Sequence, residues 1–166
     1  MASKCSTPMI QFARCSVRIA LFIFIAVNIL GCSDRSMPES LHATVNPFIG
    51  TGGHGHTYPG ATVPFGMVQL SPDSRLDGWD GCGGYHYSDS MIYGFSHTHL
   101  QGTGVSDYGD ILIMPCTQFR ADAETWADRY KSRFDHEQEN AHAGYYNVQL
   151  QDHGVDAELT TTERVG

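Results

Sequence analysis

From Val45 to Gln118, glycine or proline recurs every few residues, and this limits the possible folds more than any other feature of the chain. Both residues interrupt helices, and no apolar pattern at i, i+3 and i+4 persists through the stretch. The residues therefore predict loops and short strands. The best strand candidates are residues 67–70, MVQL, and residues 110–116, DILIMPC, and the second is apolar enough to be buried on both faces.

A charged segment, ADAETWADRYKSRFDHEQEN at residues 121–140, follows this loop-rich half. Trp126 and Tyr130 stand four residues apart, so one turn of helix would place both rings on the same side, against a sheet. A short helix and an ordered loop fit the composition equally well, and both interpretations stay open.

The last part of the chain carries the clearest strand pattern. Residues 145–150 and 155–165 alternate apolar and polar side chains, and residues 151–154, QDHG, supply Asp and Gly for a turn between them. An antiparallel hairpin follows, with one face toward a core and one toward solvent. The core face would hold Tyr146, Val148, Leu150, Val155, Ala157 and Leu159, and the solvent face Gln149, Asp156 and Glu158. The whole pattern predicts an all-β fold, an antiparallel β-sandwich.

The N-terminus follows different rules from the rest of the chain. Three basic residues precede an apolar run at residues 19–30, which is short for a membrane span and typical of a signal peptide. A small residue and Cys32 follow, as in a bacterial lipoprotein box, in which the cysteine is acylated and becomes the mature N-terminus. We expect a lipoprotein signal peptide at residues 1–32, a polar tether at residues 33–44 and the sandwich domain at residues 45–166. A plain secretory signal is the alternative.

The charge of the mature chain is strongly negative. Residues 1–32 hold three bases and no acid, so seven Lys and Arg remain against eighteen Asp and Glu, a net charge of −11. This balance argues against a nucleic-acid partner. Only Cys82 and Cys116 would remain to form a disulfide, and their spacing leaves open whether they pair.

Two histidine pairs, His54 with His56 and His97 with His99, are spaced as in strands that carry zinc ligands, because both members would point to one face. Glycines rather than an apolar run precede the first pair, however, and no later residue completes a ligand set at a recognisable spacing. Hydrogen bonds from the rings to loop carbonyls are the better-supported interpretation. We therefore assign no metal ligand, and a zinc hydrolase is the weakest of the functional hypotheses.

Sugar binding is a third explanation for the polar loops. A sugar offers hydroxyls around its edge and a weakly apolar CH face, which polar side chains and an aromatic plate can hold. Trp79 lies between Asp77 and Asp80 in a glycine-rich stretch. Its indole is therefore either an exposed stacking platform or a plug in the core.

Three blocks of sequence together resemble glycoside hydrolase family 92. They are VNPFIGTGGHGHTYPGATVPFGMVQLSPD, GGYHYSDSMIYGFSHTHLQGTGVSDYGDILIMP and GYYNVQL followed by GVDAELTTTERVG. They stand in the family's order and cover nearly all of residues 45–166. Members of the family are calcium-dependent exo-α-mannosidases that act with inversion, commonly lipoproteins or secreted proteins of bacteria. One departure is Val105, where a cysteine often stands.

The resemblance implies a larger enzyme, of which this chain is an incomplete N-terminal sandwich. In the family an (α/α)6 barrel follows and carries the catalytic acid, the base and the Ca²⁺ ligands, so no catalytic residue is assigned here. Sandwich loops of the family help to form the substrate pocket, so residues 96–110 are expected to form a wall of that pocket or the seam between the two domains. The resemblance thereby suggests these substrate-binding residues: Gly52, Gly53, His54, Trp79, Asp80, His97 and His99. Asp107 and Asp110 are expected to hold the amides of their own loop instead.

The expected location follows from the signal and the resemblance. We expect a cell-envelope protein, lipid-anchored in the periplasm or at the outer-membrane surface, with mannose-containing glycans and its own barrel domain as partners. The alternative is a lipid-anchored glycan-binding module without catalysis, which would use the same ring and carboxylates. By itself the 166-residue chain is expected to lack mannosidase activity, because the carboxyl pair that inversion needs lies elsewhere.

Overall fold

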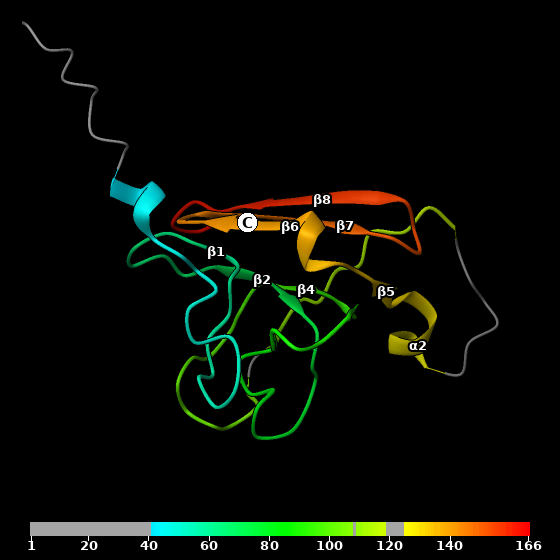
Figure 1. Ribbon diagram of the computed structural model, residues 1–166, viewed down its shortest axis with the longest axis horizontal. Coiled ribbons are helices and arrows are strands. Elements are labelled where there is room, and N and C mark those ends of the chain that lie inside the picture. Colours follow the sequence, from blue (N-terminus) through cyan, green and yellow to red (C-terminus); the bar gives the residue numbers. More distant parts are fainter. Residues whose placement is uncertain (1–40, 108, 119–124) are drawn as a thin grey trace, which may run out of the picture. The chain divides into compact units, whose positions relative to one another are not determined.

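The computed structural model describes residues 41–107, 109–118 and 125–166 (Figure 1). Short strands and long loops make up this part of the chain. Within it, no helix has the length and apolar character needed to cross a membrane. The expected signal peptide, with Cys32, and most of the expected tether lie outside the described residues. The last tether residues form a 3₁₀ turn, η1 (Leu41–Thr44).

One antiparallel sheet has the order β6 (Glu139–His142), β7 (Tyr145–Leu150) and β8 (Val155–Thr160). Its register sets the apolar residues of β7 and β8 opposite one another: Tyr146 with Leu159, Val148 with Ala157, and Leu150 with Val155. Five of these six side chains are buried and Val155 is half-buried, whereas Asp156 and Glu158 are exposed. The predicted hairpin is confirmed, but its second strand ends at Thr160 rather than at residue 165. The turn ends at Gly154, which has a φ of 61°.

The charged segment before this hairpin contains more than one element. Its described part holds α2 (Trp126–Tyr130), β5 (Ser132–Arg133) and η2 (His136–Gln138), and it ends in the first residues of β6. A short helix was one of the two interpretations, but β6 is not predicted. The reason is that β6 reads Glu-Asn-Ala-His, with a charged residue at the inward position 139, so the sequence shows no apolar alternation.

A second antiparallel sheet has the order β1 (Ala61–Thr62), β2 (Gln69–Asp73) and β4 (Gly94–Ser96). The strand predicted at residues 67–70 therefore exists but begins two residues later. Met67 is 73% exposed, and its N–H donates to the carbonyl of Glu163 at 2.7 Å rather than to a strand of this sheet.

The strand predicted at residues 110–116 is wrong. Only Ile113 pairs with β4, through an isolated bridge in which its N–H and carbonyl each bond Phe95 at 2.8 to 2.9 Å. Ile111 has a φ of 58°, which breaks the extended conformation, and its side chain is 71% exposed. Ile113 is 53% exposed. The prediction failed because apolar composition does not reveal whether another layer covers a segment. Within the described chain, Ile111 and Ile113 remain largely exposed.

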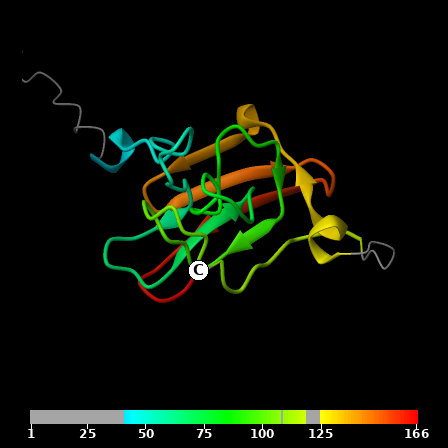
Figure 2. The ribbon, with the colours of Figure 1, turned by 90° about the horizontal axis from the view of Figure 1, so that it is seen from below.

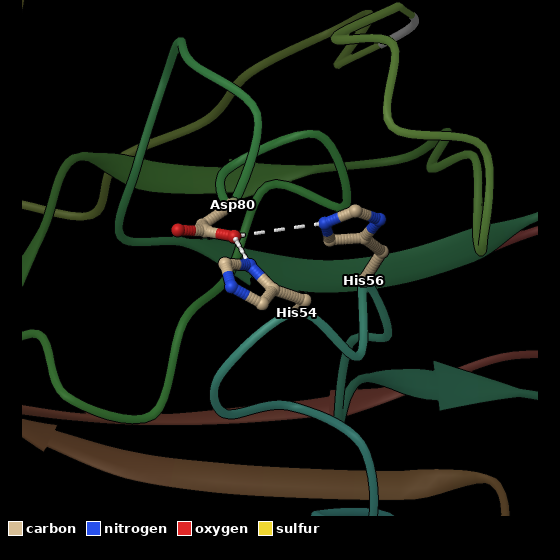
Figure 3. Close-up of side chains that lie close together, drawn as sticks. All are labelled: His54, His56 and Asp80. Atoms are coloured by element: carbon tan, nitrogen blue, oxygen red, sulfur yellow. Dashed lines mark hydrogen bonds and ion pairs between the residues drawn. The ribbon is translucent and has the colours of Figure 1, made fainter.

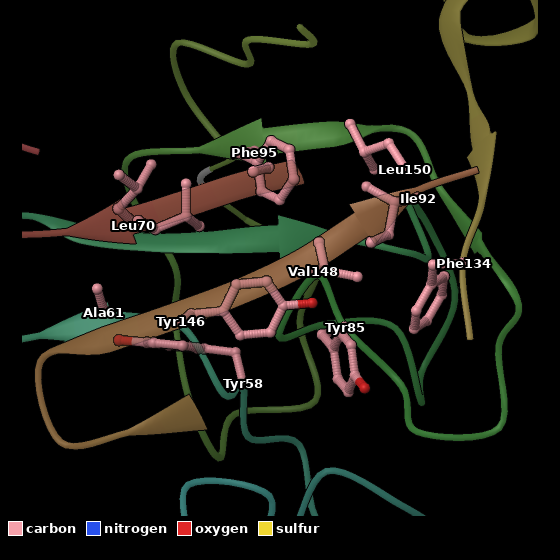
Figure 4. Packing of buried hydrophobic residues seen from close by; sticks show 12 residues of the cluster. Tyr58, Ala61, Leu70, Tyr85, Ile92, Phe95, Phe134, Tyr146, Val148 and Leu150 are labelled. Carbon is pink, nitrogen blue, oxygen red and sulfur yellow. The ribbon is translucent and has the colours of Figure 1, made fainter. Parts of the chain in front are cut away.

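The two sheets pack face to face as the two layers of a sandwich (Figures 1 and 2), and β3 (Met91–Ile92) pairs with β5 beside them. The all-β antiparallel prediction is thus confirmed. Figure 4 shows side chains of both layers meeting in one apolar core. The core comprises Tyr58, Ala61, Leu70, Tyr85, Ile92, Phe95, Phe134, Tyr146, Val148, Leu150, Ala157 and Leu159.

Candidate functional site

Three loops gather on the side of β2 and β4 that faces away from β7 and β8 (Figure 1). They are residues 50–60, 74–90 and 97–110. Hydrogen bonds tie them to one another: the Gly102 N–H donates to the His56 carbonyl at 2.9 Å, and Ser106 Oγ donates to the Gly78 carbonyl at 3.2 Å. The three loops are therefore held together in one place.

His54 and His56 meet Asp80 within these loops (Figure 3). Asp80 Oδ1 lies 2.6 Å from His54 Nδ1 and 3.7 Å from His56 Nε2. The His54 side chain is 79% exposed and that of His56 only 6%. The hydrogen bond from His54 lowers the pKa of the Asp80 carboxyl below its ordinary value, so this carboxylate stays ionised at neutral pH. Asp80 thus completes a cluster that spacing along the chain did not reveal.

Trp79 stands at the edge of the same cluster. Its ring contacts His56 edge-on, with centroids 4.9 Å apart and planes at 80°. The side chain is 61% exposed, so the indole is not a core plug. A Cβ at Gly104 would clash with the indole, and Gly104 has a φ of 70°, so glycine is required there for two reasons. The loop at 97–110 therefore supports Trp79 from behind while leaving much of the ring open.

His99 is buried and bonded on both ring nitrogens. Its Nδ1 lies 2.7 Å from the Gln69 carbonyl, and its Nε2 lies 3.0 Å from Ser96 Oγ and 3.1 Å from Asp73 Oδ1. The ring therefore fixes the 97–110 loop to β2 and β4. The other oxygen, Asp73 Oδ2, is buried without a hydrogen-bond partner. His99 and Asp73 also line a hollow of about 140 Å³.

His97 does not share a site with His99. Its Nδ1 lies 2.9 Å from the Ile111 carbonyl, and its ring lines a different hollow, against β8. The expected common face fails because β4 ends at Ser96, so strand alternation does not continue through the pair. Of the two histidine pairs, only the first converges on one point.

Gly52 and Gly53 lie at the exposed rim of the first loop. A Cβ at Gly53 would meet nothing within 4 Å, and its φ of 59° is what favours glycine there. Its carbonyl lies 3.1 Å from His86 Nε2. The sterically critical glycine is Gly55, where a Cβ would collide with the backbone of Gly50. Sequence reasoning missed Gly55, since a close approach of two backbones leaves no pattern in the chain.

The carboxylate of Asp110 serves its own loop. Thr98 Oγ1 donates to Asp110 Oδ2 at 3.3 Å and accepts from the Asp110 N–H at 3.1 Å. Asp107 is exposed and lines the same hollow as His99. The Asp110 carboxylate thus holds a hydroxyl of its own loop rather than the expected amide.

A buried carboxylate at Glu139 was not anticipated from the sequence. Its side chain is 1% exposed and accepts from Tyr146 Oη at 2.6 Å and from Tyr85 Oη at 3.0 Å, and it lies 2.6 Å from His136 Nδ1. Burial, followed by the charge of Glu139, raises the pKa of both tyrosines well above the ordinary value. Glu139 and Tyr146 belong to β6 and β7, and Tyr85 belongs to the loop at residues 74–90, so the cluster fixes this loop to the β6–β7–β8 sheet.

The two cysteines of the described chain do not form a disulfide with each other. Cys82 is buried, Cys116 is exposed, and both are free.

A family profile identifies the chain. The profile of the glycosyl hydrolase family 92 N-terminal domain matches residues 44–166. The chain belongs to this family. The resemblance of the three sequence blocks is thereby confirmed.

Solved structures from family 92 share this fold. An α-mannosidase of the family from Bacteroides thetaiotaomicron, in complex with mannoimidazole, is 45% identical with a TM-score of 0.69 over 75% of this chain. An inverting mannosidase of the family from the same species is 33% identical with a TM-score of 0.59 over 72% of the chain. A secreted glycosidase of Arthroderma benhamiae is 33% identical over 129 residues, 72% of this chain. The chain spans only 16 to 17% of the length of these relatives.

The family's calcium ion was expected in the other domain, and the described residues do not fit it. The one group of three or more His, Cys, Asp or Glu ligands that converges among them is His54, His56 and Asp80. Ca²⁺ takes six to eight oxygen ligands, whereas this group offers two nitrogens and one carboxylate.

Proposed function

We propose that the complete protein is an exo-α-mannosidase that inverts the anomeric centre, and that this chain supplies the loop wall of its sugar pocket. The proposal is supported by family membership and by the relative whose structure contains mannoimidazole. The single observation on this chain that carries it is the indole of Trp79, 61% exposed and flanked by the ionised carboxylate of Asp80. An open ring beside a charged acceptor is what a pyranose needs, because its CH face stacks and its hydroxyls donate.

The loop residues that would line the sugar pocket have different roles. Trp79 gives a flat apolar surface, and Gly104 behind it lets the loop approach without touching the exposed face. Asp80 and His54 accept from and donate to sugar hydroxyls at the rim. His99 orients the 97–110 loop from below, since its nitrogens are already bonded to protein atoms. Gly52 and Gly53 allow close approach of the backbone, and His97 stays a candidate on the opposite hollow.

The reaction itself belongs to residues beyond this chain. Inversion needs two carboxyl groups far enough apart to admit a water, one as acid and one as base, with Ca²⁺ supplied by the (α/α)6 barrel in this proposal. Apolar side chains support a seam with that domain: Phe65 is fully exposed, and Ile111 and Ile113 are 71% and 53% exposed. Large apolar patches on a protein surface mark places that another domain or protein covers.

Replacement of the indole tests the proposal. In the complete protein, Trp79→Ala should lower kcat/KM on an α-mannoside by about tenfold, the equivalent of one lost aromatic contact. Tyr145→Ala is the matched control, because its ring stacks on His142 in the β6–β7 sheet, away from the loops. An unchanged kcat/KM in Trp79→Ala would remove Trp79 from the pocket. Absence of mannose release by the complete wild-type protein, with glycan binding retained, would favour the non-catalytic binding module instead.

We also propose that the protein is lipid-anchored in the bacterial cell envelope through Cys32. The sequence of the first 32 residues, three bases, an apolar run and a small residue before cysteine, is the support. Radiolabelled palmitate should be incorporated into the wild-type protein and into Cys116→Ser, but not into Cys32→Ser. Equal labelling of all three proteins would contradict the anchor.

A further inference from the structure

One buried nitrogen in the loop cluster has no hydrogen-bond partner. His56 Nε2 is inaccessible and unbonded, in a side chain that is only 6% exposed. A buried polar atom without a partner destabilises the folded state, so native proteins rarely leave one without a reason. The nearest charged atom to which it points is Asp80 Oδ1, at 3.7 Å, which is too far for a hydrogen bond (Figure 3).

The surrounding atoms supply the rest of a ligand set. One ring nitrogen of His54, one of His56 and one Asp80 oxygen all lie within 4.8 Å of one another. Ligands of a tetrahedral ion at about 2.0–2.2 Å stand roughly 3.3–3.6 Å apart, so the 3.7 Å between His56 Nε2 and Asp80 Oδ1 is close to the separation that an ion between them requires. The shorter contact of 2.6 Å between His54 and Asp80 would have to open, and the His54 side chain, 79% exposed, has room to move.

We propose that His54, His56 and Asp80 form a binding site for a Zn²⁺ ion, with solvent in the fourth position. Two imidazoles and one carboxylate suit Zn²⁺ and disfavour Ca²⁺ and Mg²⁺, which prefer oxygen. The test of zinc binding does not depend on mannosidase activity. His56 is the fixed ligand, held by the Trp79 edge and by the Gly102 hydrogen bond to its carbonyl.

Metal binding by the complete protein tests the site directly. ZnCl₂ is titrated by calorimetry in the presence of saturating CaCl₂, so that any calcium site is filled. Wild type should bind one additional Zn²⁺ that His54→Ala and Asp80→Asn bind at least about tenfold more weakly. His142→Ala is the matched control, since it removes another exposed histidine and should bind as wild type does. His54 is mostly exposed, so its replacement leaves the fold intact, and circular dichroism checks this.

Failure of the zinc site can be distinguished from failure of the proposed mannosidase function. No zinc binding by wild type, or equal affinity in wild type, His54→Ala and Asp80→Asn, overturns the site. Co²⁺ gives an independent readout, because a tetrahedral site with nitrogen ligands produces strong visible absorption. That absorption should appear in wild type and His142→Ala and be lost in His56→Gln and His54→Ala. A mannosidase that is active but binds no zinc would overturn this site and leave the proposed function standing.

Discussion

The β7–β8 hairpin and the loop cluster around Trp79 are held together by different kinds of contact. In the hairpin the partners are near in sequence, and their apolar side chains stand directly opposite one another in a buried layer. In the loops His54 and Asp80 are 26 residues apart and are held by single hydrogen bonds and close glycine packing. The hairpin thus specifies the fold, whereas the loops specify a surface on it. Damage to the first should lower stability, and damage to the second should change binding.

Truncation in the hairpin should have the largest effect. Leu150 is fully buried, so Leu150→Ala leaves a cavity and should lower the free energy of unfolding by about 2–5 kcal/mol. Urea denaturation gives the value. Ile49→Ala, at a position 74% exposed, should change it by less than about 0.5 kcal/mol. If the two variants lost equal stability, the core assignment would be wrong.

Replacement of the buried carboxylate of Glu139 should have the next largest effect. Glu139→Gln replaces an acceptor oxygen with an amide NH₂ that faces the donors Tyr85 and Tyr146, so about 1–3 kcal/mol should be lost. Thermal unfolding measures the loss. Glu163→Gln, an exposed carboxylate on the C-terminal loop, is the control and should melt as wild type does. A Glu139→Gln protein as stable as wild type would show that the buried network contributes no net stability.

Alanine substitutions at two glycines of the 97–110 loop distinguish the effect of backbone strain from the effect of moving the Trp79 indole. Gly102 and Gly104 have φ values of 71° and 70°, so alanine at either should cost about 1–2 kcal/mol. Only at Gly104 would the added Cβ push against Trp79, whereas at Gly102 it meets nothing within 4 Å. Gly104→Ala alone should therefore lower kcat/KM, several-fold, in the complete protein. Equal kcat/KM in the two variants would mean that Trp79 is not positioned by this loop.

An ion pair at the surface should have the smallest effect, and it depends on pH. The side chain and then the backbone N–H of Arg133 lower the pKa of Asp152. Because the folded pKa is depressed, the pair stabilises the fold above the unfolded value of about 3.9, and this stabilisation is lost as pH falls through the lower folded value. Asp152→Asn should therefore melt slightly below wild type at neutral pH and nearly equal to it in strong acid. Asp156→Asn, an exposed neighbour, should show no such convergence, and a gap that widened in acid would reverse the sign proposed here.

The sequence by itself was enough for the sandwich class and the hairpin. Alternation in β7 and β8 and a turn between them are local signals, and a glycine- and proline-rich first half excludes long helices. The same reasoning failed at residues 110–116, because apolar composition does not say whether another layer covers a segment. It also missed β6, where the inward residue Glu139 is a carboxylate made tolerable by two tyrosines from other elements.

The candidate site was decided by tertiary structure. The sequence gives the histidine pairs and Trp79, but only the fold brings Asp80 to His54 and His56 and separates His97 from His99. The physical reason is that strand pairing follows a two-residue period that can be read along the chain, whereas convergence of loops depends on where the chain turns. Gly55 and Gly104 determine those turns through close contacts that leave no periodic trace in the sequence.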